Sequence, residues 1–501
     1  MGGRNMGKQY IDIPLYTTFN DISSKDFSLS ATQYKSFCIK NKNVLSVRDF
    51  LSRDLKRSDL GAEVGSDAYV EESNYFFIKT KALQADTYLL ETNKESVQNI
   101  TPMSFVNSDL KKGDLLISKD SNVGEIVILD KDYPNTMLCS GIYKLPIADK
   151  KYYLLAFIKN NIFRQQIEFL VPRGSTIRHG KTKFLDCLIP LPNKNSANTI
   201  RYIELLMQAI INKEIEIKKK YTQSIADIQN ELESNQNKAN FKYSFPSFEE
   251  IQSTMRLDSS LYSKSFKKEE FVLDNYKYGT SSIQSLGFDF IRGNNLAISV
   301  IGRSLYSDEY CDNCYMLILP QNISRYGTLM KTQYLGNKNQ LLTLKKGSIV
   351  FGAEGTFRSL LFMENTNAVT NFHGLTVYNK NNNLQESIFV KAMLDYFREH
   401  NICRSCATGG NGGSLSIEYW KYLKFPNFPD SKKKEIVRLY HNPNATYDAS
   451  KATLGNFLEY DSEFNISAGI YELDKSMKYL QVKLEQAIAC IADDEDVDIS
   501  F

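Results

Sequence analysis

The chain has 501 residues, which is too long for one ordinary hydrophobic core, so two or three domains are expected. It is 42% hydrophobic and 24% charged, as soluble globular proteins are, and it has no proline-rich or low-complexity stretch. The net charge is only +3, so any contact with nucleic acid must depend on local clusters of basic residues.

Features that would direct the chain out of the cytoplasm are missing from the sequence. The first residues lack the apolar segment of a signal peptide, and no apolar run approaches the roughly 20 residues of a membrane span. Eight cysteines in a chain of this length do not indicate a disulfide framework. We therefore expect a cytoplasmic protein that makes no membrane contact.

The sequence repeats itself at a nearly constant offset. Segment 110–118, an alternating strand leaving a Lys-Lys-Gly turn, recurs at 344–352, 234 residues later. Each copy continues with a segment of helical periodicity, a glycine-bearing loop and a strand ending in prolines. These elements lie at 152–164, 174–180 and 185–192 in the first copy, and at 388–398, 409–414 and 419–429 in the second; a weaker match joins 77–83 to 317–323. An ordered set of matches predicts two related domains.

A helix with heptad-like spacing is predicted after each copy. The first begins after the capping residues Asn195 and Ser196, and the second has the 3-4 spacing of a seam that faces another helix. The apolar positions that define the seam are Ile203, Leu206, Ile210, Ile217, Tyr221, Ile225 and Ile228 in the first helix, and Leu473, Met477, Leu480, Leu484 and Ile488 in the second.

Two α/β domains, each followed by a long helix, resemble the specificity (S) subunit of type I restriction-modification systems. The resemblance implies an α+β fold with two target-recognition domains, each a mixed sheet with helices, and two helices that form an antiparallel coiled coil. It implies double-stranded DNA as ligand, read at a bipartite site, and docking of two adenine-N6 methyltransferase (M) subunits and a motor-nuclease (R) subunit. The chain itself would be non-catalytic and bind no cofactor, since S-adenosylmethionine belongs to the partner methyltransferase.

On this basis the chain divides into five parts. They are a first target-recognition domain at 1–194, a spacer helix at 195–240, a second domain at 241–430, a second spacer helix at 431–492 and an acidic tail at 493–501. The second helix departs from the pattern, because Asn442-Pro443 breaks it and a polar and aromatic insert, 442–469, follows. The insert could form a contact surface of its own, which puts exact symmetry of the two methyltransferase sites in doubt.

The loops of the two copies differ in charge, and this predicts different half-sites. The first glycine loop is basic, and lysines, arginines and hydroxyl side chains bind phosphates and base edges. The second is uncharged, so it would offer backbone amides and an asparagine. A solvated loop is the alternative in both cases. The candidate DNA-binding residues are Arg173, Ser175, Thr176, Arg178, His179, Lys181 and Lys183, the turn residues Lys119, Ser121 and Asn122, and Thr356, Arg358, Asn411 and Ser414 in the second copy.

Catalytic and nucleotide-binding motifs fail on inspection. The loop from Gly174 to Thr182 has one residue too many between its glycines for a phosphate-binding P-loop, and prolines follow it instead of a helix. No Asn/Asp-Pro-Pro-Tyr/Phe motif of an amino-methyltransferase is present. Two C-x-x-C pairs, Cys311 with Cys314 and Cys403 with Cys406, could hold a structural zinc. The pairs lie about 90 residues apart, and the first copy has no counterpart.

Three other functions stay open at this stage. The chain could serve a methylation-only or other defence complex that lacks a nuclease, it could be a coiled-coil adaptor that touches no DNA, or it could be a fused enzyme. The missing catalytic motif argues against the last.

Overall fold

A computed structural model describes residues 9–171, 179–238, 240–409 and 413–501, and these form two compact units. The first unit comprises residues 9–216, 447–466 and 473–501, and the second comprises 217–446 and 467–472. The chain therefore leaves the first unit and returns to it twice.

The first unit is built from small sheets and short helices. One sheet has the order β5-β4-β8, another has the order β7-β6-β9, and two strand pairs, β1-β2 and β3-β10, complete the set. The elements are β1 (Ile11–Asp12), α1 (Phe19–Ser24), β2 (Ser36–Phe37), β3 (Val44–Ser46), β4 (Phe76–Ile78), β5 (Val97–Asn99), β6 (Leu115–Ser118), β7 (Ile126–Ile128), β8 (Thr136–Leu138), β9 (Ile142–Leu145), α2 (Lys151–Lys159), α3 (Asn161–Leu170) and β10 (Leu188–Pro190).

The second unit has two four-stranded sheets, β12-β19-β16-β17 and β13-β15-β14-β18, and the pair β11-β20. Its elements are α5 (Phe248–Thr254), α6 (Lys264–Asp274), β11 (Thr280–Ser281), β12 (Phe288–Arg292), α7 (Ile298–Ile301), β13 (Leu305–Ser307), β14 (Tyr315–Ile318), β15 (Gln333–Gly336), β16 (Ile349–Gly352), β17 (Ser359–Leu361), β18 (Ala368–Thr370), β19 (Gly374–Asn379), α8 (Leu384–Glu399), α9 (Ile402–Cys406), β20 (Phe425–Pro426) and α10 (Asp430–Tyr440).

The two units repeat the same strand pairing in the same register. Leu115 opposes Ile128 and Leu145 across β6, and Ile349 opposes Leu361 and Val377 across β16. The parallel pair β4-β8 corresponds to β14-β18, and β3-β10 corresponds to β11-β20. Because a slip of one residue would turn every side chain to the opposite face, matching registers mean that both copies bury the same positions. The predicted duplication and α+β fold class are confirmed.

A glycine at the same place in each copy allows the backbone to approach closely. A Cβ on Gly61 would lie 2.2 Å from the carbonyl oxygen of Cys139, and one on Gly293 would lie 2.1 Å from that of Asn371. Real Cβ atoms do not come so close, so neither position admits a side chain without movement of the backbone.

One predicted helix is in fact two. The periodic segment 152–164 is interrupted at Asn160, whose backbone is extended and whose side chain accepts a hydrogen bond from the amide of Ile162. This N-cap starts α3 anew. In the second unit the corresponding α8 runs unbroken for 16 residues.

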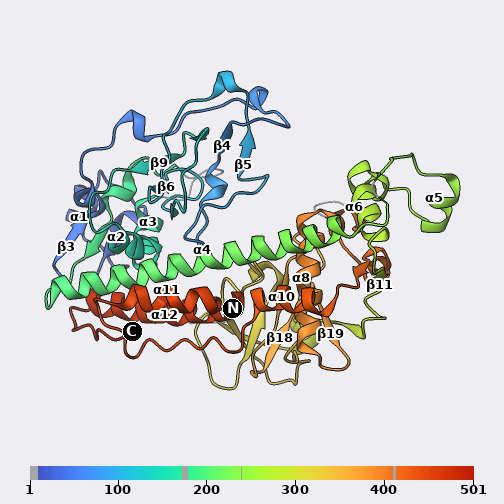
Figure 1. Ribbon diagram of the computed structural model, residues 1–501. Coiled ribbons are helices and arrows are strands. Elements are labelled where there is room, and N and C mark those ends of the chain that lie inside the picture. Colours follow the sequence, from blue (N-terminus) through green and yellow to red (C-terminus); the bar gives the residue numbers. More distant parts are fainter. Residues whose placement is uncertain (1–8, 172–178, 239, 410–412) are drawn as a thin grey trace. The chain divides into compact units, whose positions relative to one another are not determined.

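The helices after each copy contribute to both units. Helix α4 (Ser196–Ser234) has 39 residues, which span about 58 Å at ~1.5 Å per residue. Asn193, just before α4, donates to Asp494, just after α12 (Ile470–Ala492), so the two helices run antiparallel in the first unit. Figure 1 shows α11 and α12 alongside the first part of α4.

The insert joins the core of the first unit. Residues 447–466 belong to that unit and contain most of α11 (Phe457–Ser467). Phe457 is fully buried in the same apolar cluster as Leu206 of α4 and Leu480 of α12. The segment that follows the break after α10 therefore packs against α4.

Candidate nucleic-acid interface

Two of the predicted DNA-contact segments meet at one edge of the first unit. Where β6 ends, the carbonyl of Lys119 accepts a hydrogen bond from the amide of Gly180 at 2.7 Å. Next to it, Nδ1 of His179 lies 2.9 Å from Oδ1 of Asp120. The turn after β6 and the end of the basic glycine loop thus form one surface.

Several predicted side chains on this edge are exposed. Ser121, Lys181 and Lys183 face solvent, and neither lysine has a carboxylate within 4.0 Å in the part of the chain that is described. Lys119 pairs with Asp120 and is 19% exposed. Asn122 is half-buried and donates to the carbonyl of Leu83 at 3.1 Å, so it holds neighbouring turns together.

The corresponding edge of the second unit is built by the same backbone contacts. An isolated bridge joins Glu354 to Ser414, as one joins Asp120 to His179 in the first unit. Oε2 of Glu354 lies 2.9 Å from Nδ1 of His373, whose ring lies 3.9 Å from that of Phe372. Together with Arg292 these side chains line a hollow.

The other predicted residues of the second edge are divided between surface and interior. Thr356 is exposed in the turn after β16. Arg358 is half-buried, and its guanidinium donates to the carbonyl of Ile323 at 2.8 Å, the counterpart of the contact that Asn122 makes. Five predicted residues lie outside the described residues: Arg173, Ser175, Thr176, Arg178 and Asn411.

Sequence reasoning missed the acid–histidine pairs. Asp120 and Glu354 occupy equivalent positions, but the histidines come from different loops, since His179 follows the first glycine loop and His373 precedes β19. A carboxylate can accept from cytosine N4, and an arginine such as Arg292 can donate to guanine, so the edges carry groups suited to base readout. The signal that could have found them was the alignment of Asp120 with Glu354 at the offset of 234.

A buried lysine also recurs, 232 residues apart. Nζ of Lys159 in α2 donates to the carbonyl of Gln84 at 2.8 Å, and Nζ of Lys391 in α8 lies 2.6 Å from Asp395. Burial lowers the pKa of Lys159 to about 8, although Glu125 opposes the shift. Burial likewise lowers the pKa of Lys391 against the attraction of Asp395. These lysines are part of the domain core.

The predicted helix seam is occupied within the chain. Ile203, Leu206 and Ile210 share a buried cluster with Leu480, Leu484 and Ile488 in the first unit. Ile217, Tyr221 and Ile228 are buried in the second unit's part of α4, and Leu473 is fully buried. Ile225 and Met477 are half-buried. Elsewhere on α12, Tyr479 and Val482 are 46% and 52% exposed.

The four cysteines that could hold a structural zinc do not come together as one metal site among the described residues. Cys311 and Cys314 form a disulfide with each other, while Cys403 and Cys406 are free thiols on α9. Among the described residues no group of three or more His, Cys, Asp or Glu side chains could hold a metal. Burial raises the pKa of Cys406 to about 12 and also that of Cys403, so both pack as neutral thiols.

Within the described residues no helix combines the length and apolar character that crossing a membrane requires.

Neither a protein-family model nor a curated protein matches the sequence. Several solved structures resemble the chain, among them the following three. One is the type I restriction-modification S subunit from M. genitalium, with a TM-score of 0.34 and 12% identity over 90% of this chain and 95% of that one. Another comes from work on complex assembly and conformational transition of the type I R-M system. It has a TM-score of 0.26 and 11% sequence identity, and the match covers 91% of this chain and 98% of that one. The third is the HsdS subunit from Thermoanaerobacter tengcongensis, with a TM-score of 0.25 and 10% sequence identity over 90% of this chain and 96% of that one.

Proposed function

We propose that the chain is the DNA-specificity subunit of a type I restriction-modification complex. The observation that carries the proposal is the duplication itself: two units with the same register present equivalent loop edges that differ in side chains. A protein that reads two parts of one duplex needs two such surfaces. Lysines and hydroxyls position the backbone, and the carboxylates, histidines and Arg292 are available for base edges.

The proposed DNA site is bipartite and asymmetric. The first edge offers Lys181 and Lys183 beside the Asp120–His179 pair, whereas the second offers Arg292 beside the Glu354–His373 pair. Different donors and acceptors select different base pairs, so the two half-sites differ in sequence.

In this proposal other subunits perform the chemistry. Adenine-N6 methyltransferase subunits dock on the exposed faces of the helices, and a motor-nuclease subunit joins for cleavage. The chain acts as a non-catalytic cytoplasmic reader, in keeping with the missing methyltransferase motif in its sequence.

Selection of bound duplexes from a random pool tests the proposal. Full-length protein with its co-expressed methyltransferase should enrich two short motifs at a fixed separation. Glu354→Gln with His373→Gln should alter one motif only, and Asp120→Asn with His179→Gln should alter the other only. Enrichment of no motif would refute the proposal, and a chain that binds methyltransferase but no DNA would be an adaptor.

A further inference from the structure

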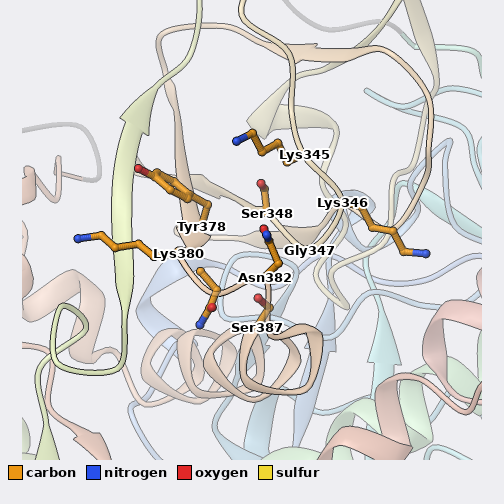
Figure 2. Close-up of a pocket in the computed structure, with 9 residues that line it drawn as sticks. Lys345, Lys346, Gly347, Ser348, Tyr378, Lys380, Asn382 and Ser387 are labelled. Atoms are coloured by element: carbon orange, nitrogen blue, oxygen red, sulfur yellow. The ribbon is translucent and has the colours of Figure 1, made fainter.

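A pocket at the start of α8 is distinct from the candidate DNA edge, because it lies at the opposite end of β16. Its lining includes the Lys-Lys-Gly turn before β16, the end of β19 and the first turn of α8. The cavity volume is about 90 Å³, which is enough for several water molecules. In Figure 2, Ser348 and Ser387 line its centre, and Lys346 and Lys380 extend on opposite sides.

Three carboxylates contact the equivalent turn of the first unit. Nζ of Lys111 lies 3.2 Å from Asp109, and the amide of Lys112 donates to Asp132 at 2.8 Å. Asp114 accepts from the amide of Lys111 at 2.8 Å and lies 3.6 Å from Nζ of Lys144. The ammonium group of Lys111 therefore has a counter-charge within the protein, and carboxylates accept hydrogen bonds from the backbone amides of the turn.

The second unit keeps both lysines and has neutral residues in place of two of the acids. Strand register aligns Asp109 with Thr343 and Asp114 with Ser348. Lys345 and Lys346 are exposed, and neither has a carboxylate within 4.0 Å among the residues described. The two turns thus share their strand register, but Thr343 and Ser348 leave the second turn without the carboxylates of Asp109 and Asp114.

Buried hydroxyls without partners face this cationic turn. Ser348 is 3% and Ser387 is 1% exposed, and neither hydroxyl makes a hydrogen bond within the described part of the chain. Oγ of Ser387 would lie 3.9 Å from a Cβ on Gly347, so it points across the pocket towards the turn. Both serines line the pocket, so their hydroxyl groups are free to donate to a ligand that enters it.

We propose that this pocket binds a phosphate group. The hydroxyls would donate to phosphate oxygens, and the ammonium groups of Lys345 and Lys346 would supply counter-charge. The pocket also lies at the N-terminus of α8, a helix of 16 residues, where the backbone dipole favours an anion and the first-turn acid Glu386 is paired with Lys433 at 3.1 Å. Lys380 contributes less, because it already lies 3.3 Å from Asp289. The phosphate is that of a free phosphate ester or of a nucleic-acid backbone.

Calorimetric titration with inorganic phosphate, in chloride buffer of constant ionic strength, tests the pocket without DNA. Full-length protein should show one saturable site. Lys345→Gln with Lys346→Gln should weaken it at least tenfold, and Ser348→Asp should abolish it by restoring the first unit's carboxylate. The matched variant Lys111→Gln with Lys112→Gln should leave the affinity unchanged within twofold. All four lysines are exposed, so these variants should fold as the parent does.

Absence of a saturable site, or equal losses from the two double variants, would overturn the proposal. Competition by a duplex that lacks the recognition motif identifies the source. If the duplex displaces phosphate, the ligand is a backbone phosphate, and the slope of log affinity against log salt should fall by about 0.9 in the Lys345/Lys346 variant. If it does not, the ligand is a free phosphate ester. Failure of DNA-motif selection would leave the phosphate titration unaffected, so the two proposals fail separately.

Discussion

A buried ion pair connects the insert to α4 and makes a sharp prediction about stability. Nζ of Lys213 lies 2.7 Å from Oδ1 of Asp461, with side-chain exposures of 0% and 1%. It also donates to Asn465 at 2.8 Å and lies 4.4 Å from the ring centre of Tyr447. Burial lowers the pKa of Lys213, while Asp461 opposes that shift. Asp461 therefore stabilises the charged ammonium group of Lys213 in the core.

Replacement of Asp461 by Asn keeps the size of the side chain and removes its charge. Because the lysine then lies buried without a counter-charge, we expect a loss of about 3–5 kcal/mol in the free energy of unfolding of the first unit. Joint replacement with Lys213→Met and Asp461→Leu should restore most of it, since apolar pairs of similar volume often match buried ion pairs. Urea denaturation gives the free energy, and hydrogen exchange of residues 457–466 assigns the transition to this unit.

The exposed pair Lys81–Glu95 of the same unit provides the control. Its atoms lie 3.3 Å apart, with side-chain exposures of 66% and 81%, and Glu95→Gln should cost less than about 1 kcal/mol. A similarly small loss from Asp461→Asn, or a double variant no more stable than the single one, would refute the reasoning that the insert is part of the first unit's core.

Two further predictions concern the first unit. Burial lowers the pKa of Lys159 to about 8, so between about pH 8 and 10.5 the unfolded chain binds a proton that the folded chain has lost. The free energy of unfolding should therefore rise with pH across this window. The rise should be about 3 kcal/mol larger in the parent protein than in Lys159→Met. A titration of unfolding free energy against pH measures the difference, and parallel curves would contradict it. Gly61→Ala should destabilise by about 1–3 kcal/mol in thermal unfolding, because its Cβ would meet carbonyl oxygens at 2.2 Å. Gly455→Ala, whose nearest neighbour is 3.8 Å away, should change little.

The duplication and most elements were predictable because they depend on local pattern. Lys-Lys-Gly turns, alternating strands and heptad spacing are each written in a few consecutive residues, and the structure places turns, strands and helices there. The break at Asn160 could also have been predicted from the sequence, because asparagine is a common N-cap residue and this one lies in the middle of the periodic segment.

Contacts between distant segments were not predictable in the same way. That Asp120 meets His179, while the equivalent Glu354 meets His373, depends on how loops fold over a sheet edge. The composition of the insert is polar and aromatic, which does not predict a buried segment. Its burial against α4 depends on the ion pair between Asp461 and Lys213, two residues far apart in the sequence. Two C-x-x-C pairs suggested a zinc site because spacing alone cannot tell whether two pairs converge.

Mapping adenine methylation in the host genome tests the central claim most directly. Deletion of this chain should remove N6-methyladenine from one asymmetric bipartite motif, and a copy carrying Glu354→Gln and His373→Gln should restore methylation at a motif changed in one half only. Unchanged methylation after the deletion, or a change in both halves with that variant, would contradict the account.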